Sequence, residues 1–240
     1  MAKSNREGVS GPLLRSKLIT CKKLRRRKKE GKHKKIVIFG FEPFGKRKAN
    51  VAGDIADAFD GLKIGGLEVR SVRLPVKWGA PLEELKKAIK KIKDEGQTVF
   101  AVIGLGETDE KRPKLERKAR NDRGETKDNE GKAPKGKTVN GGPDTYESPL
   151  FDDIKKRLKK DGADFKESGD AGSFLCEEAF YAAMHLMSTK KDEAGNAGFF
   201  HVPKYPNSGK DGQDDENKTH MRDLKRIVQK ILECIAALDP

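Results

Sequence analysis

Short apolar runs alternate with helical segments between residues 36 and 106, and this alternation constrains the fold more than any other feature of the sequence. Apolar runs without polar alternation are typical of parallel strands covered on both faces. The segment 81–96 starts with Pro, ends near Gly and keeps its apolar residues on one face, which predicts an amphipathic helix. The predicted elements are strands at 36–41, 67–76 and 98–106 and helices at 50–59 and 81–96.

The rest of the chain continues this pattern after one long polar stretch. Residues 107–147 are rich in Gly, Pro, Asp, Asn and Lys, and a loop of that length is either functional or disordered. We therefore predict an α/β fold with a twisted, mostly parallel or mixed sheet between two layers of helices. The later predicted elements are helices at 150–162, 174–191 and 219–237, a short strand before the turn at 168–172, and a strand at 198–203.

The net charge is concentrated in the first 35 residues. The chain has 52 Lys and Arg against 38 Asp and Glu, a formal charge of +14. Residues 1–35 hold 14 of the basic side chains and only two acidic ones, so they carry +12, and residues 36–240 carry +2. A folded surface that binds a polyanion throughout is therefore disfavoured. We expect a disordered basic tail at 1–34 and a single domain at 35–240.

The basic tail has several interpretations. It is either a flexible extension without a specific partner, a nuclear or other targeting signal, or an anchor to nucleic acid or an acidic surface through residues 1–35. We expect no secretory signal, because the N-terminal stretch has no apolar h-region, and the sequence has no apolar run of the ~18–20 residues that a membrane helix needs. Its three cysteines are odd in number and widely spaced, which indicates reduced thiols, and we expect a cytoplasmic protein.

Candidate reactive groups cluster where the predicted strands end. In an open parallel sheet, the loops after the carboxyl ends of the strands build the site. The loops at 41–45, 104–129 and 170–176, together with His201, deliver one Cys, one His and an acidic loop to that edge. Cys176 opens a predicted helix, whose N-terminus stabilises a thiolate. Equally, such a Cys is often a small buried hydrophobe, and such a His is often structural.

Six short motifs in order resemble the pyroglutamyl peptidase I family, cysteine peptidases that remove an N-terminal pyroglutamate. The resemblance covers roughly residues 35–240. It implies a fold of the purine nucleoside phosphorylase type, no metal and no cofactor, and members of the family often associate as homo-oligomers. The motifs are GFEPFG at 40–45, LPV at 74–76, ERKARN at 116–121, DNEGKAP at 128–134, DAGSFLC at 170–176 and GFFHVP at 198–203.

The resemblance also implies a catalytic triad of Glu116, Cys176 and His201. Cys176 would attack the pyroglutamyl carbonyl to form a thioester, His201 would move the proton, and Glu116 would orient His201. The pyroglutamyl ring suits an apolar slot with a few hydrogen bonds. The residues that match the expected lining of this slot are Phe41, Phe44, Asn50, Phe174 and Leu175.

The sequence departs from the family pattern close to these residues. Cys176 is followed by Glu177, where family members usually carry Asn, and Lys118 and Arg120 stand where apolar residues are usual. Besides an omega-peptidase, a thiol protease that acts on pyroglutamyl peptides, two alternatives therefore remain. One is an altered or inactive homologue that acts as a binding protein anchored by its tail, and the other is a cysteine hydrolase for a different acyl or amide substrate.

Overall fold

The computed structural model describes residues 34–188, 196–207, 210 and 213–239. The predictions for the basic tail, namely its disorder, its targeting role and its contacts with nucleic acid or acidic surfaces, fall on residues 1–33 and lie outside the described part. The first strand begins at Lys34. No helix in the described part is long and apolar enough to cross a membrane.

A mixed seven-stranded sheet forms the centre, in the order β2-β3-β1-β4-β9-β5-β8. Strands β3, β1, β4 and β9 are parallel, whereas β5 runs antiparallel to β9, and β6 and β7 form a separate ribbon. The strands are β1 Lys34–Phe41, β2 Lys63–Ile64, β3 Leu67–Leu74, β4 Thr98–Thr108, β5 Lys114–Glu116, β6 Lys118–Arg120, β7 Thr145–Glu147, β8 Lys166–Ser168 and β9 Ala197–Pro203.

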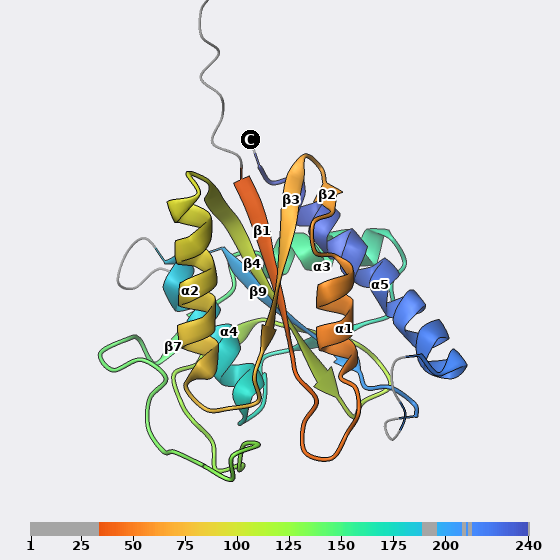
Figure 1. Cartoon of the computed structure of the whole chain (residues 1–240). Coiled ribbons are helices and arrows are strands. Elements are labelled where there is room, and N and C mark those ends of the chain that lie inside the picture. Colours follow the sequence, from red (N-terminus) through yellow and green to blue (C-terminus); the bar gives the residue numbers. More distant parts are fainter. Residues whose placement is uncertain (1–33, 189–195, 208–209, 211–212, 240) are drawn as a thin grey trace, which may run out of the picture. The chain divides into compact units, whose positions relative to one another are not determined.

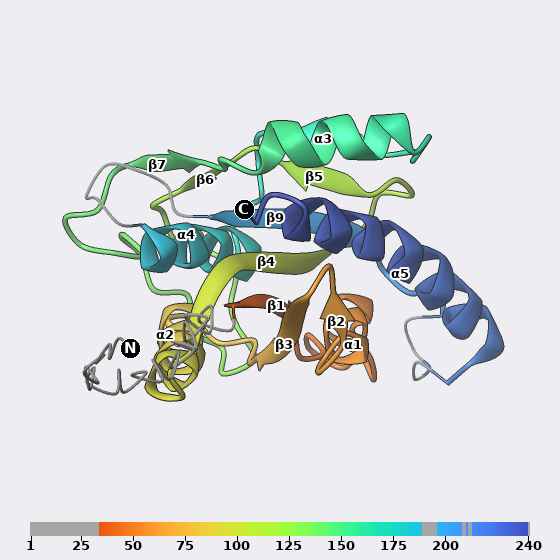
Figure 2. The ribbon, with the colours of Figure 1, turned by 90° about the horizontal axis from the view of Figure 1, so that it is seen from above.

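In the described part of the chain, five helices cover the two faces of the sheet and complete the predicted three layers, as Figures 1 and 2 let the reader follow. One apolar core lies between the sheet and α1, α3 and α5, and the other lies between the sheet and α2 and α4. The α/β fold predicted from the alternation is thereby confirmed. The helices are α1 Val51–Ala58, α2 Ala80–Asp94, α3 Phe151–Lys160, α4 Leu175–Met187 and α5 Asp215–Ala236.

Residues 36–41 show why the central strands were recognisable in the sequence. Every side chain from Ile36 to Phe41 in β1 is buried, as expected for a strand covered on both faces. The following helix α1 begins at the predicted cap, because the Asn50 side chain accepts hydrogen bonds from the backbone N–H groups of Ala52 and Gly53. These two elements place the loop 42–49 at the edge of the sheet where the candidate site lies.

Several element boundaries differ from the prediction. Residues 107–147 contain β5, β6 and β7 within the predicted loop, because strands of three residues are too short to show a period and are specified by their partners. The strand predicted at 67–76 ends at Leu74, since Pro75 cannot donate to the ladder. The helix predicted at 174–191 ends at Met187, and α5 starts at Asp215 rather than at 219.

Candidate active site

Cys176 is the second residue of α4, at the point where a tight turn enters the helix. Gly172 in this turn has φ 94°, a conformation that favours glycine, and its N–H donates to the Asp170 side chain at 3.0 Å. Phe174 follows in an extended conformation, and the helix begins at Leu175. Because α4 begins here, the thiol of Cys176 stands at the positive end of the helix dipole.

The sulfur of Cys176 packs closely against the sheet at Gly106 on β4. A Cβ atom added to Gly106 would lie 2.7 Å from the Cys176 Sγ and 2.9 Å from the Phe199 ring, so only glycine leaves room for the sulfur. Gly106 is the register partner of His201 on the neighbouring strand β9. The sheet therefore brings the predicted Cys and His to adjoining positions.

His201 and Glu116 form a buried pair across the antiparallel strands β9 and β5. The His201 Nδ1 lies 2.8 Å from the Glu116 Oε1, and the two residues are 5% and 0% exposed. Glu116 pairs in register with Phe199, so its contact with His201 is a diagonal one on the same face. A carboxylate at Nδ1 requires the hydrogen on that nitrogen, which leaves Nε2 as the proton acceptor.

The electrostatic surroundings keep the Cys176 thiol protonated. Burial raises its pKa to about 12, and the carboxylates of Glu107, Glu116 and Glu177 act in the same direction. Burial also raises the pKa of Glu107, although Arg47 and the backbone N–H of Val51 oppose this rise. At neutral pH the thiol therefore needs a base to take its proton before it can act as a nucleophile.

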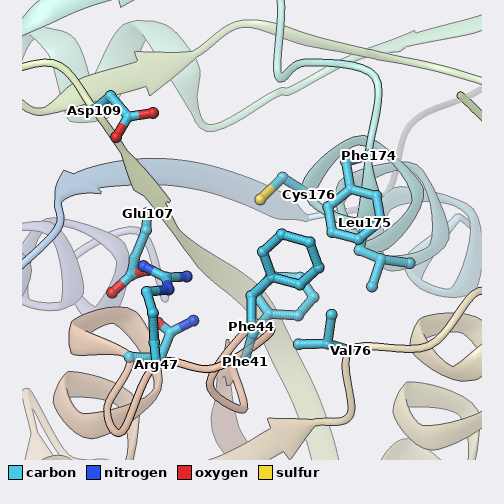
Figure 3. A pocket seen from close by; sticks show the side chains of 10 residues that line it. Phe41, Phe44, Arg47, Val76, Glu107, Asp109, Phe174, Leu175 and Cys176 are labelled. Carbon is cyan, nitrogen blue, oxygen red and sulfur yellow. The ribbon is translucent and has the colours of Figure 1, made fainter. Parts of the chain in front are cut away.

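Cys176 opens into a cavity of about 280 Å³ at the carboxyl edge of the parallel strands (Figure 3). All five residues predicted to line an apolar slot do line this cavity together with Cys176, whereas Glu116 and His201 are not among its lining residues. The structure adds four lining residues to those predicted. The lining residues are Phe41, Phe44, Arg47, Asn50, Val76, Glu107, Asp109, Phe174, Leu175 and Cys176.

One end of the cavity is aromatic. The rings of Phe44 and Phe174 have centroids 5.3 Å apart, and Trp78 meets Phe174 edge-on at the same distance. The loop that carries Phe44 is held by Asn129, whose side chain accepts from the Gly45 N–H at 2.9 Å and donates to the Pro43 carbonyl at 3.1 Å. This end of the cavity therefore has a defined apolar shape.

The other end of the cavity is charged. Arg47 forms an ion pair with Glu107, and the other Glu107 oxygen accepts the backbone N–H of Val51 at 2.8 Å. Asp109 pairs with Lys204. Figure 3 shows Arg47, Glu107 and Asp109 on one side of the Cys176 sulfur and the aromatic rings on the other. The Cys176 sulfur thus lies between an apolar end and a charge-balanced polar end.

Asn50 lines the cavity, but its side chain also has backbone partners. Besides capping α1, it donates to the Glu42 carbonyl at 3.1 Å. Val76 belongs to the LPV motif, and Glu107 and Asp109 belong to the acidic loop noted in the sequence, whereas nothing in the sequence pointed to Arg47. Within the described residues, no group of three or more His, Cys, Asp and Glu side chains is placed to hold a metal ion.

Comparison with known sequences places residues 34–237 in one family, because they match the family model described as pyroglutamyl peptidase. A pyrrolidone-carboxylate peptidase of Pyrococcus furiosus is 35% identical over 185 residues, which cover 72% of this chain and 82% of that one. A pyrrolidone-carboxylate peptidase of Aliivibrio fischeri is 34% identical over 189 residues, which cover 77% of this chain and 85% of that one.

Solved structures agree with the sequence comparison. A mutant pyrrolidone carboxyl peptidase from Pyrococcus furiosus superposes with a TM-score of 0.70 at 29% identity, covering 86% of this chain and all of that one. Pyroglutamyl peptidase I from Bacillus amyloliquefaciens has a TM-score of 0.70 at 25% identity, covering 87% of this chain and 96% of that one. With a family model that spans its whole sheet and relatives of the same architecture, the chain belongs to the pyroglutamyl peptidase family.

Proposed function

We propose that the protein is a cysteine peptidase that removes N-terminal pyroglutamate from peptides, with Cys176 as its nucleophile. The observation that carries the proposal is the placement of Cys176 in a cavity with an aromatic end, over a strand position that adjoins His201, in a chain of this family. The same observation favours an active peptidase over an inactive binding protein.

Acylation begins with transfer of the thiol proton to His201 Nε2, since Glu116 holds the other ring nitrogen. The sulfur then forms a bond to the pyroglutamyl carbonyl carbon, and the carbonyl oxygen becomes an oxyanion. Backbone N–H groups at the start of α4 stabilise this oxyanion. Protonated His201 gives its proton to the leaving nitrogen as the C–N bond breaks, which leaves a pyroglutamyl thioester and a free peptide amine.

Deacylation repeats the sequence with water in place of the thiol. His201 Nε2 takes a proton from water, the hydroxide oxygen bonds to the thioester carbon, and the C–S bond breaks to release pyroglutamate. The thiolate then recovers the proton from His201. Glu116 stabilises the charged imidazole in both halves of the reaction, as its buried carboxylate remains hydrogen-bonded to Nδ1.

The two ends of the cavity suit the two parts of the substrate. The pyroglutamyl ring is flat and uncharged, so the end lined by Phe44 and Phe174 binds it. The leaving peptide must then extend past the sulfur toward Arg47 and Glu107. Because the charged groups there are already paired, we propose only a weak preference for charge in the residue after pyroglutamate.

A thiol nucleophile has to remain reduced. Cys176 and Cys234 are both free thiols, which suits a reducing compartment such as the cytoplasm. We propose that the substrates are peptides with an N-terminal pyroglutamate in that compartment.

The test is hydrolysis of a pyroglutamyl fluorogenic amide by the full-length protein. Turnover should be blocked by iodoacetamide and lost in Cys176→Ala, whereas Cys234→Ser should keep the wild-type rate. No turnover by a folded wild-type protein would overturn the proposal. A panel of other N-terminally blocked amides, such as acetylprolyl and formyl amides, separates this activity from hydrolysis of a different acyl group.

A further inference from the structure

Glu177 lies directly after the nucleophile and is buried rather than solvated. The residue is 2% exposed, and one carboxylate oxygen accepts the backbone N–H of Arg120 on β6. The other oxygen lies 3.0 Å from the Arg120 Nη2. A buried carboxylate at the first turn of α4, next to the reactive sulfur, has to be neutralised by a charge close by.

Arg120 contacts two other parts of the chain with one guanidinium nitrogen. Its Nη2 donates to the Asp170 carboxylate and to the Gly172 carbonyl, the latter at 2.8 Å, so the two hydrogens of that nitrogen are used. The contact with Glu177 is therefore an attraction between charges. Arg120 thus joins β6, the turn at 170–172 and the first turn of α4, and the last two of these hold Cys176 between them.

Arg120 and Glu177 are also two of the positions at which the sequence departs from the family pattern. The resemblance to the family leads us to expect an apolar residue at the first position and Asn at the second, and in the structure the two charged residues found there contact each other. Without Arg120, Glu177 would be a buried charge without this ion-pair partner. Without Glu177, Arg120 would lose its contact with α4. The two departures therefore compensate each other.

We propose that Arg120 is a positioning residue that fixes Cys176 and sustains its reactivity by holding the 170–172 turn and neutralising Glu177. This inference rests on the proposed peptidase function. Charged groups face the sulfur from several elements: Glu107 on β4, Glu116 and Lys114 on β5, and Glu177 on its own helix. Among these carboxylates, Arg120 neutralises only Glu177. Arg120 also forms an ion pair with Asp170.

The test is a double-mutant cycle on the full-length protein with two measurements. One is the rate at which iodoacetamide alkylates Cys176, followed on the Cys176 peptide by mass spectrometry. The other is kcat and KM for the pyroglutamyl fluorogenic amide. The variants are Arg120→Met, Glu177→Gln and the double variant, with Arg120→Lys to keep the charge while losing the guanidinium nitrogen that contacts the turn and Glu177.

Arg120→Met should lower the alkylation rate and kcat about tenfold with KM changed less than about threefold, because Glu177 is left unpaired beside the sulfur. Glu177→Gln should raise the alkylation rate about twofold to threefold, and adding it to Arg120→Met should restore most of the loss. Arg120→Lys should fall between wild type and Arg120→Met.

The matched control is Arg112→Met. The Arg112 guanidinium also binds a carboxylate, Asp164, and a backbone carbonyl, that of Phe165 at 3.0 Å, but it lies outside the cavity. Arg112→Met should leave the alkylation rate unchanged. An Arg120→Met variant that matches this control, or a double variant as slow as Arg120→Met, would overturn the inference. Absence of wild-type turnover together with the predicted alkylation pattern would contradict the peptidase function alone.

Discussion

The parallel strands β3, β1, β4 and β9 and the inserted strands β5 to β8 contribute to the site in different ways. The four parallel strands have 7 to 11 residues each, whereas the inserted strands have three each. The parallel part supplies a buried framework, the close approach at Gly106 and the loop with the aromatic end of the cavity. The insertion supplies the buried Glu116 and the half-exposed Arg120.

The two groups of strands therefore have different roles in the site. Long buried strands fix the positions of Cys176 and His201 through packing, and short strands bring the charges that control them. His201 lies at the boundary, because β9 pairs with β4 on one side and with β5 on the other. Substitutions on either side of that boundary test whether the two parts act as one unit.

Replacement of His201 should have the largest effect, because it removes the proposed proton acceptor on the parallel side of the boundary. We expect His201→Gln to lower kcat/KM about 10⁴-fold or more in the pyroglutamyl amide assay. His220→Gln is the control, since His220 contacts the Pro203 carbonyl and does not line the cavity. A His201→Gln variant with more than a few per cent of wild-type activity would show that another group takes the proton.

Replacement of Glu116 tests the inserted side of the same boundary. Glu116→Gln keeps the side-chain volume but removes the charge that fixes the His201 tautomer, so kcat/KM should fall roughly 10³-fold with KM little changed. The control is Glu68→Gln on β3, which breaks the ion pair between Glu68 and Lys35 of β1. A loss below about tenfold would mean that the parallel part positions His201 without the insertion.

Gly106→Ala tests the close approach within the parallel part. The added methyl group would press on the Cys176 sulfur and the Phe199 ring, so kcat/KM should fall about 10-fold to 100-fold, with a loss of about 1–3 kcal/mol in the free energy of unfolding. Gly169→Ala is the control, because its nearest neighbour would be a Lys118 side-chain atom at 3.6 Å. Equal behaviour of the two variants in urea unfolding and in the assay would refute the steric argument.

The contact of Glu177 with the insertion should make stability depend on pH. Burial raises the pKa of Glu177 to about 7, so the folded state holds the proton more tightly than the unfolded state, in which Glu titrates near pH 4.3. The stability that this proton contributes is fully present below about pH 4.3, the pKa of Glu in the unfolded state. It is lost as the pH rises through about 7.

Glu177→Gln removes this dependence. The free energy of unfolding of the variant minus that of wild type should be about 1–3 kcal/mol larger at pH 8 than at pH 4.5, measured by urea titration. An equal difference between the two proteins at both pH values would mean that Arg120 fully offsets the burial of the carboxylate.

Phe44→Ala should have the smallest effect, because it changes only the apolar wall that follows β1. Phe44 is 37% exposed, so stability should change little, whereas KM for the pyroglutamyl amide should rise about tenfold through lost contact with the ring. Leu62→Ala, at a similarly exposed apolar residue outside the cavity, is the control. An unchanged KM would place the pyroglutamyl ring elsewhere in the cavity.

The sequence predicted the parallel part better than the insertion for a physical reason. Buried strands such as β1 and amphipathic helices such as α2 have a period that can be read within one segment. The strands β5, β6 and β7 are too short for a period, and they form because distant strands are there to pair with them. Glu116 was identified through its motif, whereas the strand that carries it, β5, was not predicted.

The site shows the same limit. The motifs pointed to Cys176 and to the five apolar-slot residues, all of which line one cavity. Arg47 was missed because its place depends on a loop and on an ion pair with Glu107, neither of which has a local sequence signature. The contact between Arg120 and Glu177, 57 residues apart, likewise becomes visible only in three dimensions.

The central place of β9 has a consequence for how the chain acquires activity during synthesis. β9 is the last strand along the described chain, yet it lies between β4 and β5 in the sheet. A nascent chain that lacks β9 has β4 and β5 as two unpaired edges and has no His201 to meet Glu116. In the proposed mechanism, a nascent chain without β9 is therefore inactive, and its open strand edges leave it prone to aggregation until β9 has been synthesised.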